Sequence, residues 1–304
     1  MTSALKVLVY GATGAQARPT VYELLAAGHR PVVLSRNQAK AADLVAAGAV
    51  LAEGDLGDLA SLKAAHAGVD AVAFMIPAFL ENPFAARSYA QHAIAAAREA
   101  GVRMLVWNTS GPVPPVRTNN PMNDLRIDIA ADLEASGVPY IILEPTAYME
   151  NWLGPWTSRY VTEHNQVAYP LPAQKRMGWI TSDDIGKLVV SALARPHLAG
   201  RHFRVSGIEV VTGPELAEQF AAALNRPLSY YAMPPEEMGA IMDQLLGPGA
   251  GAPVVEVYRA EYTNPEALRF YHDMTEVLTV LPVQMTTIQQ WVQKYAAAFQ
   301  PRNG

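Results

Sequence analysis

The chain has 304 residues, half of them hydrophobic, and a formal net charge of -5. This length allows one large α/β domain with an appended lobe, or two modest domains. The acidic balance argues against nucleic acid and anionic membranes as partners, because both attract basic surfaces. Cysteine is absent, which excludes disulfides, thiolate metal sites and a cysteine nucleophile. With no signal-peptide pattern and no apolar run of membrane length, we expect a soluble, cytoplasmic protein.

Short apolar runs alternate with alanine-rich helical stretches over the first half of the chain. Strands are expected in "KVLVY", "PVVLS", "AVLAEG", "VDAVAFM", "VRMLVWN" and "PYIILEP", and helices over 16–27, 38–46, 58–66, 84–100 and 122–136. This alternation is typical of a doubly wound, parallel α/β (Rossmann) sheet. The strands read as continuous apolar runs, as they should where helices cover both faces.

The alternation breaks after Pro145. The segment "RHFRVSG" is expected to return to the main sheet as a strand, and "GPGAGAP" is either a mobile lid or a linker. A capped helix is expected from "TSDDIG", a helix over 213–224, a strand in "LSYYAM" and a helix over 234–246. The predicted division is a first domain over 1–147 with a returning segment at about 181–207, and a smaller, mostly helical substrate lobe over 148–180 and 208–304.

The stretch "GATGAQA", at residues 11–17, follows the first predicted strand. Gly11 permits a sharp exit from the strand, and Gly14 lets the backbone approach a diphosphate that faces a helix N-terminus. Alanine replaces the third glycine, but Ala17 is small enough for the helix to pack on the sheet. A plain tight turn is the alternative, and the position at the start of an alternating fold favours a dinucleotide cradle. Its expected members are Gly11, Thr13, Gly14, Ala15, Gln16 and Ala17.

The end of the second strand decides which dinucleotide is bound. It reads Ser35, Arg36, Asn37, with no carboxylate to hold a ribose 2′-hydroxyl, so a 2′-phosphate and NADP(H) are favoured over NAD(H). Asp55, after the third strand, either accepts from the adenine amino group or caps the next helix. Arg18 either joins the phosphate pocket or is a solvated helix residue.

Taken together, "GATGAQA", "SRN", "GDL", "AFMIP", "WNTSGP" and "SGVPYIILEPTAYMEN" resemble the NmrA-like branch of the atypical short-chain dehydrogenases/reductases, over roughly residues 4–215. The resemblance implies a Rossmann fold, NADP(H) and a substrate pocket between two lobes. That branch includes quinone and isoflavone reductases, and also proteins that bind the coenzyme only to report redox state. The further coenzyme contacts that it implies are Asp55, Leu56, Ile76, Pro77, Asn108 and Thr146.

Two positions depart from the pattern of that family. Catalytic members often carry a lysine at the start of the helix before "SGxPY", and this chain has Arg126 there. Many also read "RPT" where this chain has "EPT", with Glu144. Both departures argue against transferring the family's mechanism unchanged. For Arg126 the reason is that a guanidinium does not donate protons in proteins.

The tyrosine and lysine dyad of the common short-chain reductases is missing. No Tyr-x-x-x-Lys occurs, and no lysine lies between Lys63 and Lys175. A ketone would need such an acid, because its reduction gives a strongly basic alkoxide. A quinone gives a stabilised hydroquinone anion that water can protonate, so positioning can suffice.

The leading hypothesis is an NADPH-dependent oxidoreductase that passes hydride to a quinone-like or conjugated carbonyl acceptor. A non-catalytic NADP(H) sensor is the alternative. We expect a small aromatic or quinone-like substrate, no metal, and a possible homodimer. Strand-end polar residues can instead satisfy local backbone groups, and the aromatic ones can be packing residues. The candidates are Thr109, Ser110, Tyr148 and Arg126 for catalysis, and Tyr148, Asn151, Trp152 and Trp156 for the substrate.

Overall fold

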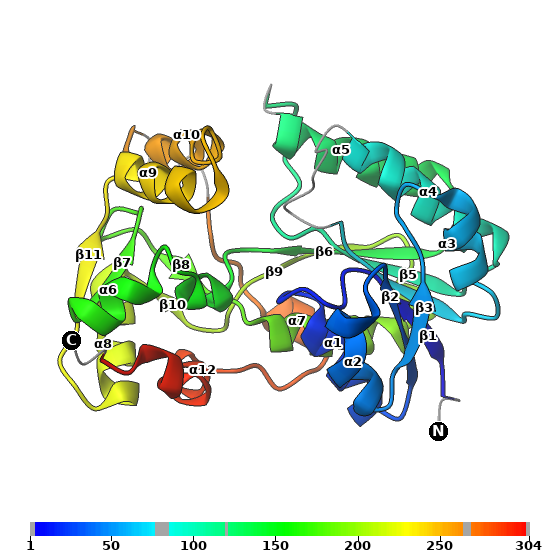
Figure 1. Ribbon diagram of the computed structural model, residues 1–304, viewed down its shortest axis with the longest axis horizontal. Helices are drawn as coiled ribbons and strands as arrows, with labels where there is room; N and C mark the ends of the chain where they lie inside the picture. Colours follow the sequence, from blue (N-terminus) through cyan, green and yellow to red (C-terminus); the bar gives the residue numbers. More distant parts are fainter. Residues whose placement is uncertain (1–3, 77–84, 119–120, 264–268, 302–304) are drawn as a thin grey trace. The chain divides into compact units, whose positions relative to one another are not determined.

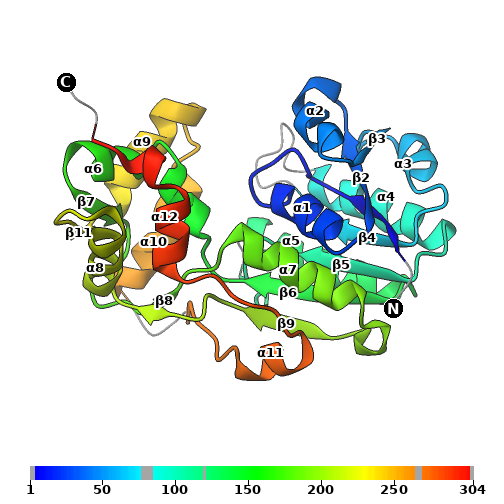
Figure 2. The ribbon, with the colours of Figure 1, turned by 90° about the horizontal axis from the view of Figure 1, so that it is seen from below.

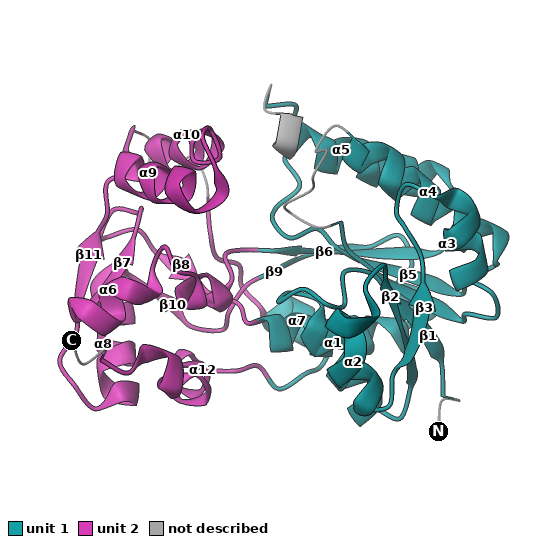
Figure 3. Ribbon diagram, viewed as in Figure 1, with its two compact units in different colours: residues 1–145, 182–205, 275–284 teal, residues 146–181, 206–274, 285–304 magenta. Residues whose placement is uncertain are grey.

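The structure is a computed structural model that describes residues 4–76, 85–118, 121–263 and 269–301. It contains two compact units (Figure 3). Unit 1 comprises 1–145, 182–205 and 275–284, and unit 2 comprises 146–181, 206–274 and 285–304. Residues 275–284 therefore cluster with unit 1, although the sequence placed them in the second lobe. Two contacts hold this segment there: Lys187 Nζ donates to Gln284 O at 3.0 Å, and Arg201 pairs with Glu276 at 3.6 Å.

Unit 1 is built on a seven-stranded parallel sheet in the order β3-β2-β1-β4-β5-β6-β9. The doubly wound fold predicted from the sequence is confirmed, and "RHFRVSG" does return as β9 beside β6. The order reverses between β1 and β4, and in such sheets ligands bind beyond the carboxyl ends of the strands at this point. The strands are β1 (Lys6–Val9), β2 (Arg30–Ser35), β3 (Val50–Glu53), β4 (Ala71–Phe74), β5 (Met104–Asn108), β6 (Tyr140–Pro145) and β9 (His202–Val205).

Helices cover both faces of this sheet (Figures 1 and 2). One face carries α3 (Leu59–Ala65), α4 (Ala86–Glu99) and α5 (Pro121–Ala135). The other carries α1 (Arg18–Ala26), α2 (Gln38–Ala46) and α7 (Ser182–Leu193), and α11 (Thr275–Val280) also belongs to the unit. Helices α1 to α5 begin and end within two residues of their predicted ranges, and α7 begins in the predicted capping segment "TSDDIG".

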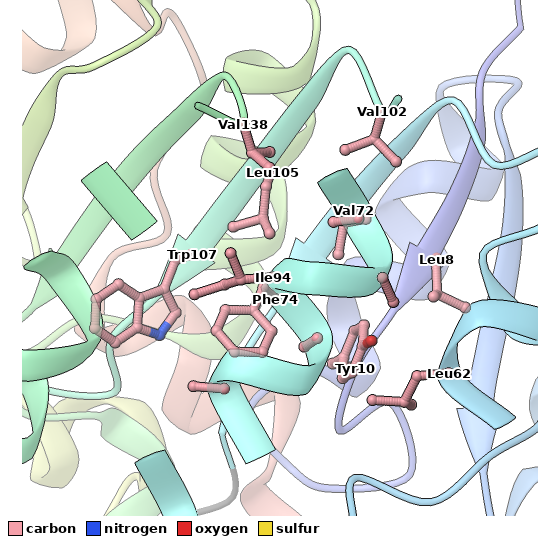
Figure 4. Close-up of a cluster of buried hydrophobic side chains, with 14 of the residues drawn as sticks. Leu8, Tyr10, Leu62, Val72, Phe74, Ile94, Val102, Leu105, Trp107 and Val138 are labelled. Atoms are coloured by element: carbon pink, nitrogen blue, oxygen red, sulfur yellow. The ribbon is translucent and has the colours of Figure 1, made fainter. Parts of the chain in front are cut away.

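The main core of unit 1 lies between the sheet and the helices α3, α4 and α5 (Figure 4). Strand side chains alternate toward this layer, so Leu8 and Tyr10 of the first strand segment share it with Phe74 and Trp107. Ile94 of α4 packs into the same cluster and is 5% exposed. Burial of these apolar surfaces fixes the strand register, since a slip of one residue would turn the same side chains outward.

A glycine sets the spacing of α1 and α7 on the opposite face. A Cβ at Gly186 of α7 would lie 3.1 Å from both the N and Cα atoms of Thr20 in α1. Backbone atoms cannot move aside as a flexible side chain can. The two helices therefore approach closely only because position 186 has no side chain.

Unit 2 combines helices with two small sheets. Strand β7 (Gln166–Tyr169) pairs in parallel with β11 (Ser229–Ala232), and β8 (Met177–Gly178) pairs with β10 (Val210–Val211). Of these strands, the sequence predicted β11 alone. The helices of this unit are α6 (Ser158–Glu163), α8 (Gly213–Leu224), α9 (Pro235–Leu246), α10 (Ala252–Thr263) and α12 (Ile288–Lys294), with short 3-10 turns η2 (Met149–Leu153) and η4 (Ala296–Phe299).

The glycine-rich segment near residue 250 closes a helical hairpin between α9 and α10. Gly251 N donates to Asp243 Oδ1 at 2.8 Å, and Val255 N donates to Gly251 O at 2.9 Å. A Cβ at Gly251 would lie 2.1 Å from Gly239 O, so the glycines here serve a close helix contact. Of the two interpretations of "GPGAGAP", these contacts support the structural connection over the lid.

We expect Gly186→Val to lower the free energy of unfolding by about 1–3 kcal/mol, because overpacking forces α7 away from α1. Chemical denaturation followed by circular dichroism measures this loss. Ala131→Val is the control, because Ala131 is exposed on α5. Its free energy of unfolding should fall only by the difference in helix propensity between alanine and valine, about 0.5 kcal/mol. Equal losses in the two variants would show that the contact between α7 and α1 is not tight.

Candidate dinucleotide-binding site

The loop after β1 has the backbone geometry of a phosphate cradle. Gly11 has φ +66°, a conformation that favours glycine, and a Cβ there would lie 2.9 Å from the flexible end of the Met75 side chain. Gly14 N donates to Gly11 O at 2.8 Å, which closes the turn. Gly14 and Ala15 are exposed, and α1 begins at Arg18. The loop therefore offers backbone to solvent beside the positive end of a helix.

Ala17, the substitute for the third glycine, is the N-cap residue of α1 and is 5% exposed. Its Cβ lies 3.9 Å from the place that a Cβ on Gly11 would take. A cavity of about 10 Å³ beneath the loop is lined by Ala17, Thr20, Met75 and Asn108 among others. That volume holds at most a single water molecule, so a larger side chain at position 17 would displace the loop or the helix.

The side chain of Arg36, just past β2, projects into solvent with 73% of its surface exposed. Its Nη1 lies 3.3 Å from Asp55 Oδ2. Ser35 and Asn37 are engaged locally: Asn37 N donates to Ser35 Oγ at 3.1 Å, and Asn37 caps α2 by accepting from Lys40 N at 3.2 Å. Arg36 is therefore the residue of the "SRN" motif that is placed to meet an incoming phosphate.

Asp55 does not cap α3. Its Oδ1 accepts from Gly57 N at 2.7 Å within a local turn, and the N-cap of α3 is Asp58, which accepts from Ala60 N at 2.9 Å. The helix-cap interpretation of Asp55 is therefore wrong. A contact between Asp55 and the adenine amino group stays a prediction.

Arg18 joins α1 to α2. Its Nη1 pairs with Asp43 Oδ2, and its Nη2 lies 3.4 Å from Lys40 O. The guanidinium of Arg18 thus contacts α2. It is not fully solvated, and it is not directed toward Arg36. A role in the phosphate pocket would require it to leave Asp43.

Further coenzyme contacts are predicted after β3, after β4 and at the end of β5. Leu56 and Ile76 are half-buried and pack against the core, and Pro77 lies outside the described residues. Asn108 is 5% exposed, and its Oδ1 accepts from Ser110 N at 3.0 Å. The amide of Asn108 thus shapes the loop after β5.

That loop holds Ser110 in the left-handed region at φ +57°. For a residue other than glycine this conformation costs about 1–2 kcal/mol. Thr109 is buried, and its hydroxyl faces two carbonyl oxygens, those of Gly111 and, at 3.1 Å, Leu143. The hydroxyl of Ser110 donates to Gln16 Oε1 at 2.6 Å. The single hydroxyl hydrogen of Thr109 is therefore used locally, and that of Ser110 is directed at the loop after β1.

Arg126 of α5 packs directly on the same loop. Its Nε donates to Thr109 O at 3.0 Å. A Cβ at Gly111 would lie 3.0 Å from Arg126 Nη2 and 3.3 Å from Cζ, so the guanidinium lies against a residue without a side chain. From the sequence, Arg126 was expected either to contact the substrate or to be solvated. Its contact with the carbonyl of Thr109 is a third arrangement, and it could not be predicted because a contact with a distant carbonyl leaves no local sequence pattern.

Glu144 of β6 holds the loop after β5 from another side. It is 5% exposed, and its Oε2 accepts from Val113 N at 3.0 Å. His202 Nδ1 lies 3.4 Å from the same carboxylate, and Arg204 Nε lies at 3.9 Å. Glu144, the glutamate of "EPT", thus accepts a hydrogen bond from the backbone of this loop and has two basic neighbours on β9.

The candidates that belong to unit 2 are largely engaged inside that unit. Thr146 is 7% exposed and donates from Oγ1 to Gly178 O at 2.6 Å. Tyr148 is 3% exposed. Asn151 is half-buried and donates from Nδ2 to Tyr169 Oη at 3.0 Å. The roles of these residues in binding coenzyme or substrate stay predictions.

The two tryptophans differ. Trp152 is fully buried, with ring centroids 5.1 Å from Tyr169 and 5.2 Å from Trp179. This placement supports the packing interpretation, because an enclosed ring presents no face to a substrate. Trp156 is half-buried, and its ring covers Gly154, where a Cβ would lie 2.3 Å from Cε2.

Unit 2 also contains polar groups that sequence reasoning did not find. The hydroxyl groups of Tyr169 and Tyr258 lie 2.7 Å apart, and burial raises the pKa of both tyrosines. Lys175 Nζ lies 2.5 Å from Glu261 Oε2, and the side chain of Glu261 is fully buried. Burial raises the pKa of Glu261, and Lys175 opposes this shift. No spacing in the sequence links these residues, which come from distant segments.

The described residues also bear on metal binding and on membrane insertion. Across the described ranges, no group of three or more histidine, aspartate and glutamate residues could hold a metal ion. In the same ranges, no helix combines the length and the apolar character needed to cross a bilayer.

Comparison with known proteins agrees with this geometry. Residues 3–265 match the NmrA-like family. Among curated proteins, an NAD(P)H azoreductase of Xenophilus azovorans is 28% identical over 96% of this chain and 99% of its own length. A (4-alkanoyl-5-oxo-2,5-dihydrofuran-3-yl)methyl phosphate reductase of Streptomyces griseus is 28% identical over 97% and 99%.

Two solved structures show the same fold. A triphenylmethane reductase of Citrobacter sp. complexed with NADP(H) superposes with a TM-score of 0.76, at 19% identity over 95% of this chain and 99% of that one. An NADPH-dependent quinone oxidoreductase of Escherichia coli complexed with NADPH gives 0.74, at 19% identity over 96% and 100%.

We expect Ala17→Leu to weaken the binding of a nicotinamide dinucleotide by about tenfold or more, because overpacking of about 1–3 kcal/mol must be relieved by moving the loop. Titration of the protein into NADPH, followed by nicotinamide fluorescence, measures the dissociation constant. Ala17→Gly removes a methyl group at the same position and is expected to bind within about threefold of wild type. Unchanged binding in the leucine variant would contradict the assignment of this turn as the cradle.

Proposed function

The chain belongs to the NmrA-like family, and from this we propose that it is an NADPH-dependent oxidoreductase that transfers hydride to a quinone-like or otherwise conjugated acceptor. One observation carries the proposal: the glycine turn at Gly11 and Gly14 and the exposed guanidinium of Arg36 follow neighbouring parallel strands of one sheet. The carboxyl ends of such strands meet at one edge, which is where dinucleotides bind.

The residues present fit the coenzyme. Gly11 adopts φ +66°, which glycine reaches without strain, and Gly14 exposes its backbone where a diphosphate would lie. Arg36 would hold the 2′-phosphate, with Asp55 beside it. When bound, NADPH supplies the hydride. The task of the chain is to hold the coenzyme and to align an acceptor with it.

Local chemistry favours an acceptor that needs no protein acid. The chain lacks a Tyr-x-x-x-Lys pair. The hydroxyl hydrogen of Thr109 is committed to carbonyl oxygens of the protein. Conjugated acceptors delocalise the negative charge that follows hydride addition, so solvent can complete their protonation. The 28% identical relatives are an azoreductase and a butenolide phosphate reductase by name, and both names denote conjugated acceptors.

A turnover assay tests this function. Purified protein is mixed with NADPH and one acceptor of each class: a benzoquinone, an azo dye, a triphenylmethane dye, an enone and a saturated ketone. Loss of nicotinamide absorbance is expected with at least one conjugated acceptor and not with the ketone. Binding of NADPH without turnover of any acceptor would overturn the proposal in favour of a coenzyme sensor. Turnover of the ketone alone would overturn the acceptor class.

Arg36→Gln is expected to raise the dissociation constant for NADPH by about tenfold or more, since charge-assisted hydrogen bonds to phosphate are lost. The constant for NADH should stay within about twofold, because NADH has no 2′-phosphate. Fluorescence titration with both coenzymes gives the ratio. Arg30→Gln is the matched control, because Arg30 is exposed at the opposite end of the same strand. Equal losses for NADPH and NADH would contradict the role of Arg36.

A further inference from the structure

The loop after β5 is held at successive backbone groups. Thr109 N donates to Leu143 O at 3.1 Å, and Ser110 N donates to Asn108 Oδ1 at 3.0 Å. Arg126 is the helix residue in this set, because its Nε donates to Thr109 O at 3.0 Å. These contacts keep Ser110 at φ +57°, a conformation that a serine adopts only when its surroundings impose it.

The held conformation directs the hydroxyl of Ser110 toward the coenzyme loop. Ser110 Oγ donates to Gln16 Oε1 at 2.6 Å, and Gln16 lies between Gly14 and α1. The contact joins segments that are 94 residues apart in the chain. A displacement of the Thr109 peptide would therefore move Ser110 relative to the cradle.

The contacts of Arg126 with this loop are to groups without charge. The carbonyl oxygen of Thr109 is neutral, and the flat guanidinium lies where a side chain of Gly111 would be. A lysine, which catalytic relatives are expected to carry at this position, has one terminal ammonium and no Nε donor part-way along its chain. Arg126 is thus suited to hold a backbone rather than to replace a catalytic ammonium.

We propose that Arg126 is a positioning residue of the reductase site: through its Nε donor to Thr109 and its contact with Gly111, it fixes the conformation in which Ser110 meets the coenzyme loop at Gln16. The kinetic consequence rests on the proposed function, whereas the structural consequence does not.

A matched pair of variants separates the donor from the charge. In Arg126→Gln the amide nitrogen is attached to Cδ, as Nε is in arginine, so a neutral N–H remains at the same distance from the backbone. Arg126→Met has a similar length and no N–H. We expect Arg126→Gln, which keeps the donor to Thr109, to retain at least threefold more of the wild-type kcat than Arg126→Met, which should lose about tenfold or more because small misplacements in a site are costly. Arg98→Met, at an exposed arginine of α4, controls for loss of surface charge.

The double variant tests whether Arg126 acts through Ser110. Ser110→Ala removes the hydroxyl that contacts Gln16. If Arg126 acts through that hydroxyl, adding Arg126→Met to Ser110→Ala should lower kcat by no more than about twofold further, because coupled residues are not additive. Additive losses would overturn the proposal, as would equal losses in the glutamine and methionine variants.

Amide hydrogen exchange gives a readout that does not depend on turnover. Exchange at residues 109–113 should be faster in Arg126→Met than in wild type and close to wild type in Arg126→Gln. If wild type binds NADPH but reduces no acceptor, the proposed function fails while exchange still decides the role of Arg126. Unchanged exchange in Arg126→Met, with its melting temperature also unchanged, would overturn the positioning role.

Discussion

The arrangement of unit 1 depends on how closely helix α1 approaches the atoms around it. At its N-terminus, Ala17 fits against Gly11, and along its length Thr20 meets Gly186 of α7 without an intervening side chain. Within the turn between β1 and α1, Gly14 N donates to Gly11 O and Arg18 N donates to Gly14 O, so the position of the turn is tied to the start of the helix. Anion binding at a helix N-terminus needs only backbone groups, but it needs them in one place. The glycine and alanine positions supply that placement.

The same edge of the sheet is shaped by a second loop, and the two loops are stabilised in different ways. The turn after β1 relies on missing side chains, whereas the loop after β5 relies on many polar contacts. Leu143 and Glu144 hold it from β6, and Arg126 holds it from α5. A strained serine persists only when several contacts each oppose its relaxation. The Ser110 contact with Gln16 then couples one loop to the other.

The sequence predicted the parts of the fold that depend on local patterns. Strands β1, β2, β4, β5 and β6 are largely buried and read as apolar runs, and the edge strand β3 is half-exposed but keeps the same alternation with helices, which was enough to identify the sheet. Strands β8 and β10 have two residues each, too few for any periodicity to appear. Residues 275–284 join unit 1 through contacts with Lys187 and Arg201, which no local pattern encodes.

The site shows the same division between local and distant information. Gly11, Gly14 and Arg36 could be predicted because backbone freedom, or residue type at a strand end, is visible in the sequence. The contact of Arg126 with Thr109 O could not be predicted, since it depends on which carbonyl the side chain reaches. For Trp152 the sequence left two interpretations open, because its near-helical spacing with Trp156 and Tyr160 is compatible with core packing or with an aromatic substrate-binding surface. The complete burial of Trp152 in the structure supports packing.

The pairing of Arg36 with Asp55 is consistent with a phosphate site and does not compete strongly with one. Both side chains are largely in solvent, at 73% and 44% exposure, and such pairs are weak because water screens them. Gly57 N fixes Asp55 Oδ1, so the carboxylate is held while the guanidinium stays mobile at the end of its chain. A phosphate dianion offers more charge and a bidentate geometry to the same guanidinium. The contact with Asp55 therefore leaves Arg36 available to a stronger anion such as the 2′-phosphate of the proposed coenzyme.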